Sequence, residues 1–440
     1  MTLTPGRILV AILLIVGLAG TLVNGAAFYI RLLYLGGLLV LSSWWWTMFS
    51  LHGLKVERHA RALRGSVGEI FEEHYEVANE DRLLKLWVEV DNETTLPNAA
   101  GSRVLTLLRG RQKRTYTARS WLTRRGGFLL GPTALTSGDP FGLFRITRRF
   151  SSRTSLVVLP MIFRVTQFLS PPGLLPGGKV IRRKSADVTP HAAGVREYVP
   201  GDAMKRIHWP TSIRRGQLMV KEFERDPQAE VWLFLDTQAG VHAEKRQEVP
   251  ELPTDDLMLI RRPKFSLPPS TLEYAISITA SLAHYFLDQR RAVGLVTAGQ
   301  AYPVIPAERS ERQESKILEA LAFMQADGTL SLASLVTAQA SQLPQGSSAI
   351  LVTPTIWPEL LLAVDDLQRR NLRPVVVLLM VESFGFKKSN ESLADNLAQR
   401  GIPVCRVYCN ADLPQTLSSF AATSFSQDMS WQRPVLSHLT

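Results

Sequence analysis

The residues from Ile8 to Leu51 are almost all apolar, and this run constrains the fold more than any other feature of the sequence. Asn24 and Arg31 interrupt the run near its middle, which favours two membrane spans over one. Leu32 to Leu51 is free of charge and matches the ~20 residues that a helix needs to cross the hydrocarbon core. The sequence therefore predicts a hairpin of two transmembrane helices. The first runs from Ile8 to Val23, or to Ala27 if it is extended, and Arg31 is expected at the turn.

Charged and aromatic residues at the ends of the two spans predict their orientation. Trp44, Trp45 and Trp46 lie near the end of the second span, where amphipathic rings favour the headgroup region. Basic residues flank the hairpin on both sides: Arg7, Lys55, Arg58, Arg61 and Arg64. We therefore expect a multi-pass protein with both ends of the hairpin and the rest of the chain in the cytosol. The alternative is that the first span is a signal peptide cleaved near Ala26 or Ala27.

The residues from Val67 to about Leu159 show the period-two alternation of half-buried strands. The pattern is clearest where Leu84, Leu86, Val88 and Val90 alternate with other residues. Similar runs occur at Ile70–Ala78, Val104–Leu108, Thr115–Leu122, Phe128–Leu135 and Ser155–Leu159, with Asn, Gly and Pro between them. Several short strands without a helical period predict a β-sandwich. Asp139-Pro140-Phe141-Gly142 predicts a tight turn, because Pro presets φ and Gly permits positive φ.

The basic excess of the chain, a formal net charge of +11, is local. Gly101 to Pro160 holds 12 basic residues and one acidic residue, and Met161 to Phe234 holds 12 basic and seven acidic residues. The first 100 residues and Leu235 to Thr440 are slightly acidic. No nucleic-acid-binding motif accompanies the basic segment, and aromatic residues are not interleaved with it. We therefore expect membrane lipids or an acidic protein as partner, and no nucleic acid.

The most distinctive stretch, the signature segment, runs from Gly194 to Glu224. Pro200-Gly201 predicts a turn, Asp202 is suited to cap a short helix after it, and Pro210 disfavours helix at Trp209. The simplest interpretation is a structural ion-pair network, because Arg–carboxylate pairs commonly fix irregular backbone. Its expected members are Arg196, Arg206, Arg214 and Arg215 with Glu197, Asp202, Glu222 and Glu224.

At this segment the chain resembles the bacterial family called domain of unknown function 58. The resemblance is carried by Arg196-Glu197-Tyr198 with Gly201-Asp202, by Arg206-Ile207-His208-Trp209, by Lys221-Glu222-Phe223-Glu224, and upstream by Asp139-Pro140-Phe141-Gly142-Leu143. It implies a protein of the bacterial cytoplasmic (inner) membrane with a von Willebrand factor A-like domain at its C-terminal end. It also implies association with AAA+ ATPases of the MoxR type, in assembly or maturation of other proteins. The family signature residues, expected to be structural or partner-binding, are Arg196, Glu197, Tyr198, Gly201, Asp202, Arg206, His208, Trp209, Lys221 and Glu222.

Strands and helices alternate over residues 227–440. Apolar runs typical of buried strands occur at Val231–Leu235, Val293–Thr297, Ala349–Thr353, Pro374–Met380 and Val404–Tyr408. Helical patterns separate them at Leu272–Leu287, Ser310–Met324, Pro358–Arg370 and Glu391–Arg400. The pattern predicts a doubly wound, Rossmann-like α/β domain with a mainly parallel sheet. We therefore expect four parts: two transmembrane helices (1–54), a β-sandwich (55–165), a linker with the signature segment (166–226) and the α/β domain (227–440).

Asp236 follows the first predicted strand of the α/β domain, at the edge where such sheets bind ligands. The von Willebrand-type resemblance implies a divalent-metal site there, built on Asp-x-Ser-x-Ser and completed by a Thr and an Asp from later loops. Asp236 and Thr329 fit this pattern, but Gln238 and Gly240 stand at the two Ser positions. Since divalent cations need several oxygen ligands, we expect a degenerate remnant, no bound metal and no cofactor.

These observations favour a membrane-anchored, non-enzymatic adaptor or scaffold, which by resemblance works with a MoxR-type AAA+ ATPase. A divalent-metal-dependent ligand-binding module centred on Asp236 is the first alternative. An enzyme acting at the Arg196–Trp209 segment is the second, with His208 as proton donor. That second alternative requires Glu197, Asp202 and His208 to converge on a cleft.

Overall fold

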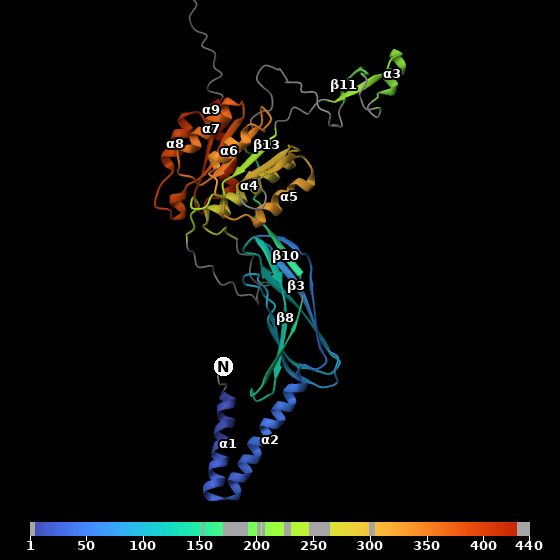
Figure 1. Cartoon of the computed structure of the whole chain (residues 1–440), viewed down its shortest axis with the longest axis vertical. Coiled ribbons are helices and arrows are strands. Elements are labelled where there is room, and N and C mark those ends of the chain that lie inside the picture. Colours follow the sequence, from blue (N-terminus) through green and yellow to red (C-terminus); the bar gives the residue numbers. More distant parts are fainter. Residues whose placement is uncertain are drawn as a thin grey trace, which may run out of the picture. The chain divides into compact units, whose positions relative to one another are not determined.

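The computed structural model describes residues 5–151, 154–169, 192–199, 204, 207–223, 230–245, 265–298 and 304–428 (Figure 1). The chain divides into two compact units. The first comprises Met1–Met161, Glu248–Ser266 and Leu321–Phe323, and it contains the apolar helices and most of the antiparallel strands. The second comprises Ile162–Gln247, Leu267–Ala320 and Met324–Thr440 and contains the α/β part.

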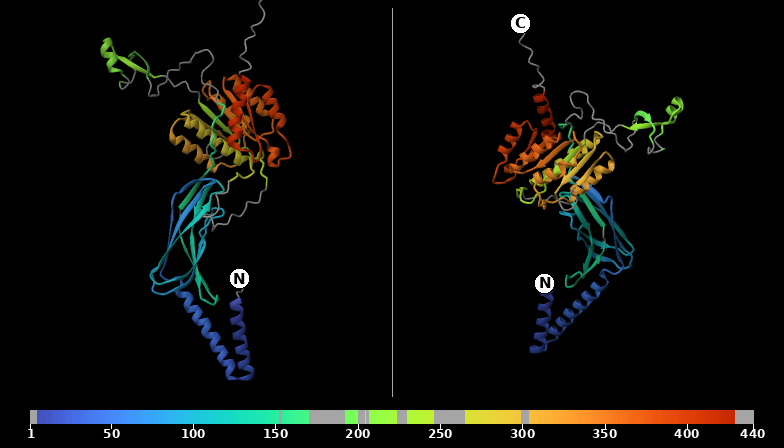
Figure 2. Two further views of the ribbon diagram at one scale, coloured as in Figure 1. Left: turned by 180° about the vertical axis from the view of Figure 1, so that it is seen from behind. Right: turned by 45° about the horizontal axis from the view of Figure 1, so that its top comes forward.

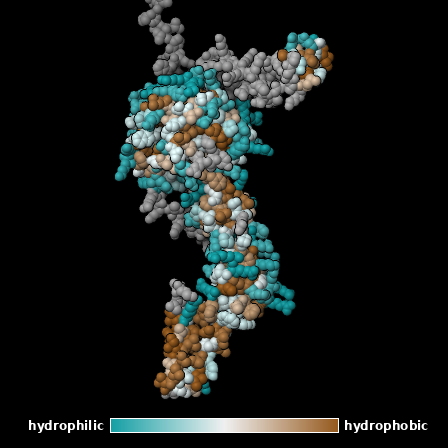
Figure 3. All heavy atoms as spheres, viewed as in Figure 1, coloured by the Kyte–Doolittle hydropathy of each residue, from teal (hydrophilic) through white to brown (hydrophobic). Residues whose placement is uncertain are grey.

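Helices α1 (Pro5–Asn24) and α2 (Ala27–Ser50) pack against each other as an antiparallel hairpin, and both are long and apolar enough to cross a membrane. Their exposed apolar side chains colour both helices brown in Figure 3. Small residues allow the close approach. A Cβ added at Gly17 would lie 3.1 Å from the backbone nitrogen of Leu33, and one at Gly36 would lie 2.7 Å from Cδ2 of Leu14. The two helices are therefore shaped to fit each other.

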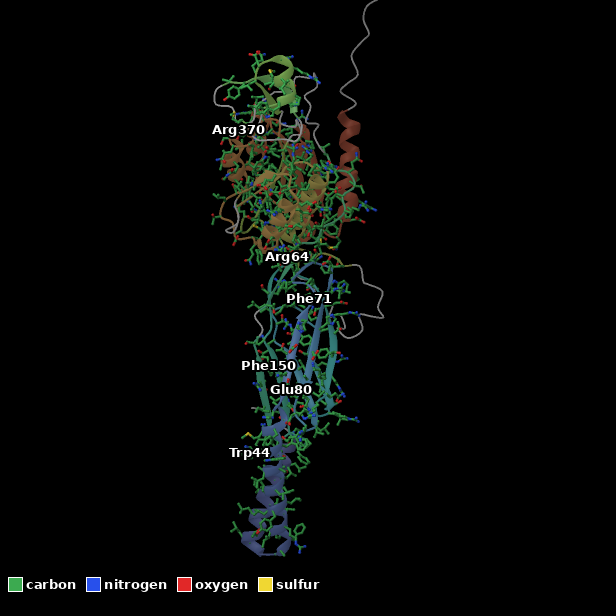
Figure 4. The ribbon with its side chains drawn as sticks, turned by 90° about the vertical axis from the view of Figure 1, so that its right-hand side faces the viewer. Trp44, Arg64, Phe71, Glu80, Phe150 and Arg370 are labelled. Carbon is green, nitrogen blue, oxygen red and sulfur yellow. The ribbon has the colours of Figure 1, made fainter. Side chains whose placement is uncertain are left out.

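The turn of the hairpin differs from the prediction. It lies at Gly25 and Ala26, where Gly25 has φ +57°, and Arg31 lies inside α2. The prediction that Arg31 forms the turn is therefore wrong. A long Arg side chain can extend toward the interface from within a span, so its charge does not need to end the helix. Trp44 lies in the half of α2 nearer the strands (Figure 4).

Helix α2 is joined to the strands through a buried lysine. After Ser50 the chain passes Gly53 (φ +69°) and enters β1 (Leu54–Ala60). Lys85, whose side chain is 2% exposed, donates from Nζ to the carbonyl of Phe49 at 2.7 Å and lies 3.4 Å from Oδ2 of Asp81. A cation at this position satisfies a carbonyl in the last turn of a helix. Burial lowers the pKa of Lys85, opposed by Asp81.

The strands after α2 form a two-layered structure. One sheet has the order β1-β3-β6, with β3 at Ile70–Asn79 and β6 at Lys113–Trp121. The facing sheet has the order β5-β4-β8-β9, with bounds Arg103–Leu108, Lys85–Asn92, Thr133–Gly138 and Arg145–Phe150. Inward residues of both sheets share one core that includes Tyr75, Val77, Val88, Val90 and Leu135. The alternation seen in the sequence thus produces two face-to-face antiparallel sheets.

A further sheet, β2-β10-β7, continues this layered unit, with bounds Arg64–Ser66, Thr154–Leu159 and Gly126–Leu130. The single run predicted over Phe128–Leu135 is two strands, β7 and β8, separated at Gly131 and Pro132. Strand β3 runs from Phe71, far from the helices, to Glu80 just past its end beside them (Figure 4). The amide of Glu80 donates to the carbonyl of Gly53 at 2.8 Å, which fixes this end of β3 at the end of α2.

Two basic residues counted as flanks of the hairpin belong to β1 and are ion-paired. Lys55 Nζ lies 2.6 Å from Glu80, and the Nε of the buried Arg58 lies 2.8 Å from Oε1 of the buried Glu73. Burial raises the pKa of Glu73, opposed by Arg58. Arg58 therefore balances a buried carboxylate instead of adding a free charge beside the apolar helices.

The α/β unit contains a sheet of six described strands in the order β15-β14-β13-β16-β17-β18. All neighbouring pairs are parallel except β14–β15, which is antiparallel. The strand bounds in chain order are β13 Val231–Leu235, β14 Val293–Thr297, β15 Val304–Glu308, β16 Ser348–Thr353, β17 Arg373–Leu379 and β18 Val404–Val407. The helices are α4 Thr271–Asp288, α5 Glu311–Phe323, α6 Leu332–Ala340, α7 Glu359–Arg369, α8 Glu391–Gln399 and α9 Leu413–Asp428.

Helices cover both faces of this sheet (Figure 2). Side chains of α6, α7 and α8 share a core with Trp232 and Phe234 of β13 and with Leu351 of β16. Helix α4 packs on the other face, beside α5, to which His284 and Glu314 link it at 2.8 Å. The predicted doubly wound α/β region with a mainly parallel sheet is therefore confirmed.

We predict that Lys85→Ala lowers the unfolding free energy by about 1–3 kcal/mol, because it leaves the Phe49 carbonyl without its donor and Asp81 without its nearest cation. Thermal melting of the full-length protein in detergent measures the effect. Lys55→Ala is the matched control, since its ion pair with Glu80 is exposed and should contribute about 1 kcal/mol or less. Equal shifts for both variants would contradict a special role for Lys85.

Candidate functional site

The carboxyl ends of β13 and β16 form the first candidate site. These strands lie side by side, and the connections from them lead in opposite directions along the sheet, so ligands of a doubly wound fold are expected here. Asp236 follows β13 directly, and Thr353 is the last residue of β16. The topology thus brings an acid and a hydroxyl together that are far apart in sequence.

Asp236 is held by hydrogen bonds from its neighbours and is 2% exposed. Thr353 Oγ1 donates to Oδ2 of Asp236 at 2.6 Å, and the amide of Gln238 donates to Oδ1 at 3.0 Å. Burial raises the pKa of Asp236, and these two hydrogen bonds oppose the shift. Each carboxylate oxygen is therefore engaged within the protein, and the charge has no cationic partner among the groups that shift its pKa.

The other predicted member of the metal remnant, Thr329, lies on a neighbouring loop. Gln238 forms an isolated parallel bridge with Gly328, and the amide of Ala239 donates to the Gly328 carbonyl at 2.8 Å. This pairing brings the loop of Thr329 to the loop of Asp236, but the Thr329 side chain is exposed. Among the described residues, no group of three or more His, Cys, Asp or Glu is placed to hold a metal ion.

The sequence reasoning did not select two further polar groups at this edge. His242 lies with Nε2 3.1 Å from the carbonyl oxygen of Asp236 and Nδ1 3.1 Å from Oγ1 of Thr271. Thr297, the last residue of β14, lies 3.2 Å from Thr237 through their hydroxyls. Thr297 could have been predicted as a residue of this edge, because it ends a predicted strand. His242 could not have been predicted, because it lies in a loop with no regular sequence pattern.

The second candidate site is the signature module, which we define as residues 192–199 and 207–223. Strand β11 (Ala192–Glu197) pairs antiparallel with β12 (Met219–Phe223), and α3 (Trp209–Arg215) lies between them in sequence (Figure 1). Ser212 is buried and ties the helix to the strand, because the amide of Met219 donates to its hydroxyl at 2.8 Å. Ile207 and Val220 are also buried.

Helix α3 differs from the prediction, since it begins at Trp209 instead of ending before it. Pro210 lies in the first turn, where the missing N–H is not needed, so Pro favours a helix start there. Asp202, expected to cap a helix, lies outside the described residues together with Gly201 and Arg206. The side chains of Arg196, Lys221 and Glu222 are also outside the described set.

The described signature residues use their polar groups within the module. Glu197 accepts a hydrogen bond from Gln217 at 2.9 Å, and the His208 ring lies 2.7 Å from the hydroxyl of Thr211. Tyr198 is half-buried, and its amide donates to the carbonyl of Leu218. Met219 of β12 lies between Glu197 and His208. It pairs with Glu197 across the two strands, and its carbonyl accepts a hydrogen bond from the amide of His208. These two groups do not form an acid–base pair.

Arg214 and Arg215 are exposed and form no ion pair with any described residue. The module instead displays apolar side chains. Its exposed large apolar residues are Val195, Val199, Trp209, Ile213 and Leu218, to which Met204 adds a neighbour in sequence. Trp209 is 59% exposed and Ile213 is 78% exposed. A small module that exposes several large apolar groups has the composition of a protein-binding surface.

Comparison with known proteins gives a family match at this module. Residues 194–252 match the family model described as "Protein of unknown function DUF58". "Uncharacterized protein YeaD" of Bacillus subtilis (strain 168) is 27% identical over 221 residues, which are 49% of this chain and 47% of the relative. The chain thus spans about half the length of this curated relative.

Two solved structures show weak likeness. The CARDB domain of the PF1109 protein from Pyrococcus furiosus, solved in complex with di-metal ions, is 14% identical, with a TM-score of 0.18 over 24% of this chain and 91% of that one. A GH20 exo beta-N-acetylglucosaminidase from Vibrio harveyi is 9% identical, with a TM-score of 0.17 over 80% of this chain and 81% of that one. These TM-scores are too low to indicate a common fold.

We predict that Asp236→Asn stabilises the protein near neutral pH and that this gain shrinks on acidification. The folded pKa of Asp236 is raised, so its protonation favours folding below the ordinary aspartate pKa, and that contribution is lost as pH rises through the folded pKa. A gain of about 1 kcal/mol, or roughly 2–4 °C in melting temperature, is expected above that window. Asp366→Asn, in an exposed pair with Arg370, is the control and should show no such stabilisation. A wild type that is more stable than Asp236→Asn at every pH would contradict the prediction.

Proposed function

We propose that this protein is a membrane-anchored adaptor without catalytic activity, which holds a protein partner at the bacterial cytoplasmic membrane. One observation carries the proposal. The signature module exposes large apolar side chains, while its described polar groups at Glu197, His208 and Ser212 are engaged in its own hydrogen bonds. Such a surface suits binding of another protein better than chemistry on a small molecule.

Helices α1 and α2 supply the anchor in this proposal. Their close packing at Gly17 and Gly36 supports a retained hairpin over a cleaved first span, because cleavage would expose the small residues that fit α1 to α2. The start of α1 and the end of α2 both contact the β-rich unit, through Arg7 and Phe49. The two ends therefore lie on one side of the membrane, and the basic β-rich segment favours the cytosolic side.

The partner is proposed to be an AAA+ ATPase of the MoxR type, and this identity comes from the family resemblance. The same resemblance suggests that the α/β unit is a von Willebrand factor A-type domain. Its strand order, with the antiparallel β15 at one edge, and Asp236 after the first strand support that assignment. The unit then serves as a second interaction domain on the same chain.

A divalent-metal-dependent ligand-binding module is the alternative, centred on Asp236. Both carboxylate oxygens of Asp236 already accept hydrogen bonds, so a cation would have to replace the Thr353 hydroxyl or share an oxygen with it. Mg²⁺ or Mn²⁺ that raises the melting temperature of the wild type, but not of Asp236→Ala, would favour this alternative over the adaptor.

We predict that Trp209→Ala combined with Ile213→Asp abolishes recovery of the ATPase when the tagged full-length chain is purified from solubilised membranes. Exposed Trp residues at interfaces commonly contribute about 2 kcal/mol or more, and an Asp at the centre of an apolar contact adds a desolvation cost. Quantitative mass spectrometry of the recovered proteins measures the loss.

The matched control for this experiment is Leu362→Asp, since Leu362 is 70% exposed on α7, close to the 78% of Ile213. The control should recover the ATPase as the wild type does. Equal recovery by the double variant would remove the signature module as the docking surface. Repeated failure of the wild type to recover any AAA+ ATPase would overturn the proposed partner.

A further inference from the structure

We infer that three loops at the end of the β-rich unit nearest the helices bind the anionic headgroups of the membrane that α1 and α2 enter. We call residues 80–84, 107–112 and 139–144 the helix-side loops. The inference deepens the proposed function, because it rests on membrane anchoring by the two helices. It adds a lipid-binding surface that holds the β-rich unit against the bilayer.

Hydrogen bonds fix the three loops at the ends of the helices. The amide of Glu80 donates to the carbonyl of Gly53, three residues after α2, at 2.8 Å. The amide of Arg111 donates to the carbonyl of Asp81 at 2.9 Å, which joins the second loop to the first. Arg7, in the first turn of α1, donates from Nε to the carbonyl of Leu143 at 2.8 Å. All three loops therefore lie where the helices leave the hydrocarbon.

The third loop is shaped by the motif predicted to form a tight turn. Asp139 is buried, and its carboxylate accepts from the amides of Phe141 at 2.9 Å, Leu143 at 3.2 Å and Phe144 at 2.6 Å. Gly142 has φ +72°, which favours Gly. The Asp139 carboxylate is thus fully engaged by backbone amides of its own loop. The Phe141 side chain remains exposed, and the backbone of Phe141 lies beside Gly6 at the start of α1.

Apolar side chains are exposed on each helix-side loop: Leu83, Leu84, Leu107 and Phe141. Single exposed apolar residues are ordinary on a protein surface. Here, however, they are concentrated on loops that hydrogen bonds tie to the two helix ends, where an apolar group can enter the interfacial region of a bilayer. Their position therefore matches the depth of the headgroups.

The charges of the loops complement anionic lipid. Arg82, Arg109 and Arg111 are exposed, and within the described residues their side chains form neither ion pairs nor hydrogen bonds. Several basic residues on the strands are engaged instead. Lys113, Arg119 and Arg149 pair with Glu76, Glu72 and Glu93, and Arg103, Arg145 and Arg148 lie over aromatic rings. The three free arginines of the helix-side loops thus lie where a lipid surface would meet them.

The acidic residues of the loops do not cancel this charge. Glu80 is paired with Lys55 at 2.6 Å, Asp81 is paired with Lys85, and Asp139 is engaged by three amides. An acidic protein partner would also meet three free arginines, but it would not need exposed Leu and Phe side chains at the ends of membrane helices. Free arginines beside exposed apolar side chains at the helix ends therefore favour a lipid surface over an acidic protein.

The test uses the full-length chain in nanodiscs, with a fluorophore on a single introduced cysteine and a quencher on the lipid near the glycerol. The background is Cys409→Ser. Cys405 can stay, because it is buried and burial raises the pKa of its thiol to about 12. Leu84→Cys reports on the helix-side loops. Leu63→Cys is the matched control, because Leu84 is 40% exposed and Leu63 is 45% exposed. Leu63 lies beyond β1, a strand of seven residues that separates it from α2 by about 20 Å.

We expect strong quenching at position 84 and little at position 63, in discs that contain phosphatidylglycerol. In discs of phosphatidylcholine alone, quenching at position 84 should be weaker. Replacing Arg82, Arg109 and Arg111 by Gln should remove this difference, with the loop–lipid equilibrium constant falling about fivefold for each arginine. Higher salt should act in the same direction in the wild type.

Equal quenching at positions 84 and 63 would overturn the inference, and it would leave the anchor intact if the chain still elutes with the discs. A phosphatidylglycerol effect that survives the triple Gln substitution would also overturn it. Failure of the chain to elute with discs would remove both the anchor and the lipid surface. None of these outcomes depends on the ATPase partner, whose test is the separate purification with Trp209 and Ile213 variants.

Discussion

The first compact unit depends on how two apolar helices end. A helix carries unsatisfied carbonyls at its C-terminal end, and these need partners where the helix end is buried. In α2, the buried ammonium of Lys85 meets the Phe49 carbonyl at 2.7 Å, and Gly53, with φ +69°, connects the helix to β1. At the start of α1, Arg7 meets the Leu143 carbonyl. These two cation–carbonyl contacts connect the hairpin to the strands, so the position of the sheets follows from the helix ends.

The distribution of charge follows from the same arrangement. Part of the basic excess is paired with acids on neighbouring strands, as in Lys113 with Glu76 and Arg119 with Glu72, and Arg58 is buried against Glu73. Arg82, Arg109 and Arg111, whose side chains pair with no described residue, lie on loops near the helix ends. The sequence count located the basic segment, but it could not distinguish paired from free cations, because a pair across antiparallel strands such as Arg119 with Glu72 joins residues 47 positions apart. This distinction is what locates the proposed lipid-binding surface on the helix-side loops.

In the α/β unit the polar groups meet at the end of the central strands, yet they satisfy each other. The Asp236 carboxylate, the Thr353 hydroxyl and the Gln238 amide form a closed set of hydrogen bonds. A metal needs oxygens that are turned outward and not already engaged. In the signature module Glu197 and His208 are also engaged in hydrogen bonds, but the module in addition exposes large apolar side chains. The contrast is why the proposed function is placed at the module and not at the sheet edge.

The sequence by itself determined the elements with strong local patterns. The bounds of β13 and β14 agree with the predicted Val231–Leu235 and Val293–Thr297, because a strand buried on both faces is a continuous apolar run. Strands β1 and β15 escaped prediction. Strand β1 begins soon after α2 and carries charges of both signs, and β15 is a short edge strand with three of its five residues exposed. Only the tertiary structure decided the role of Lys85, the start of α3 at Trp209 and the meeting of Asp236 with Thr353. The contacts of Lys85 with Phe49 and of Asp236 with Thr353 join residues that are distant in sequence, and no local sequence pattern encodes such contacts. The start of α3 at Trp209 is one of two conformations that the local sequence allows, and packing selects it.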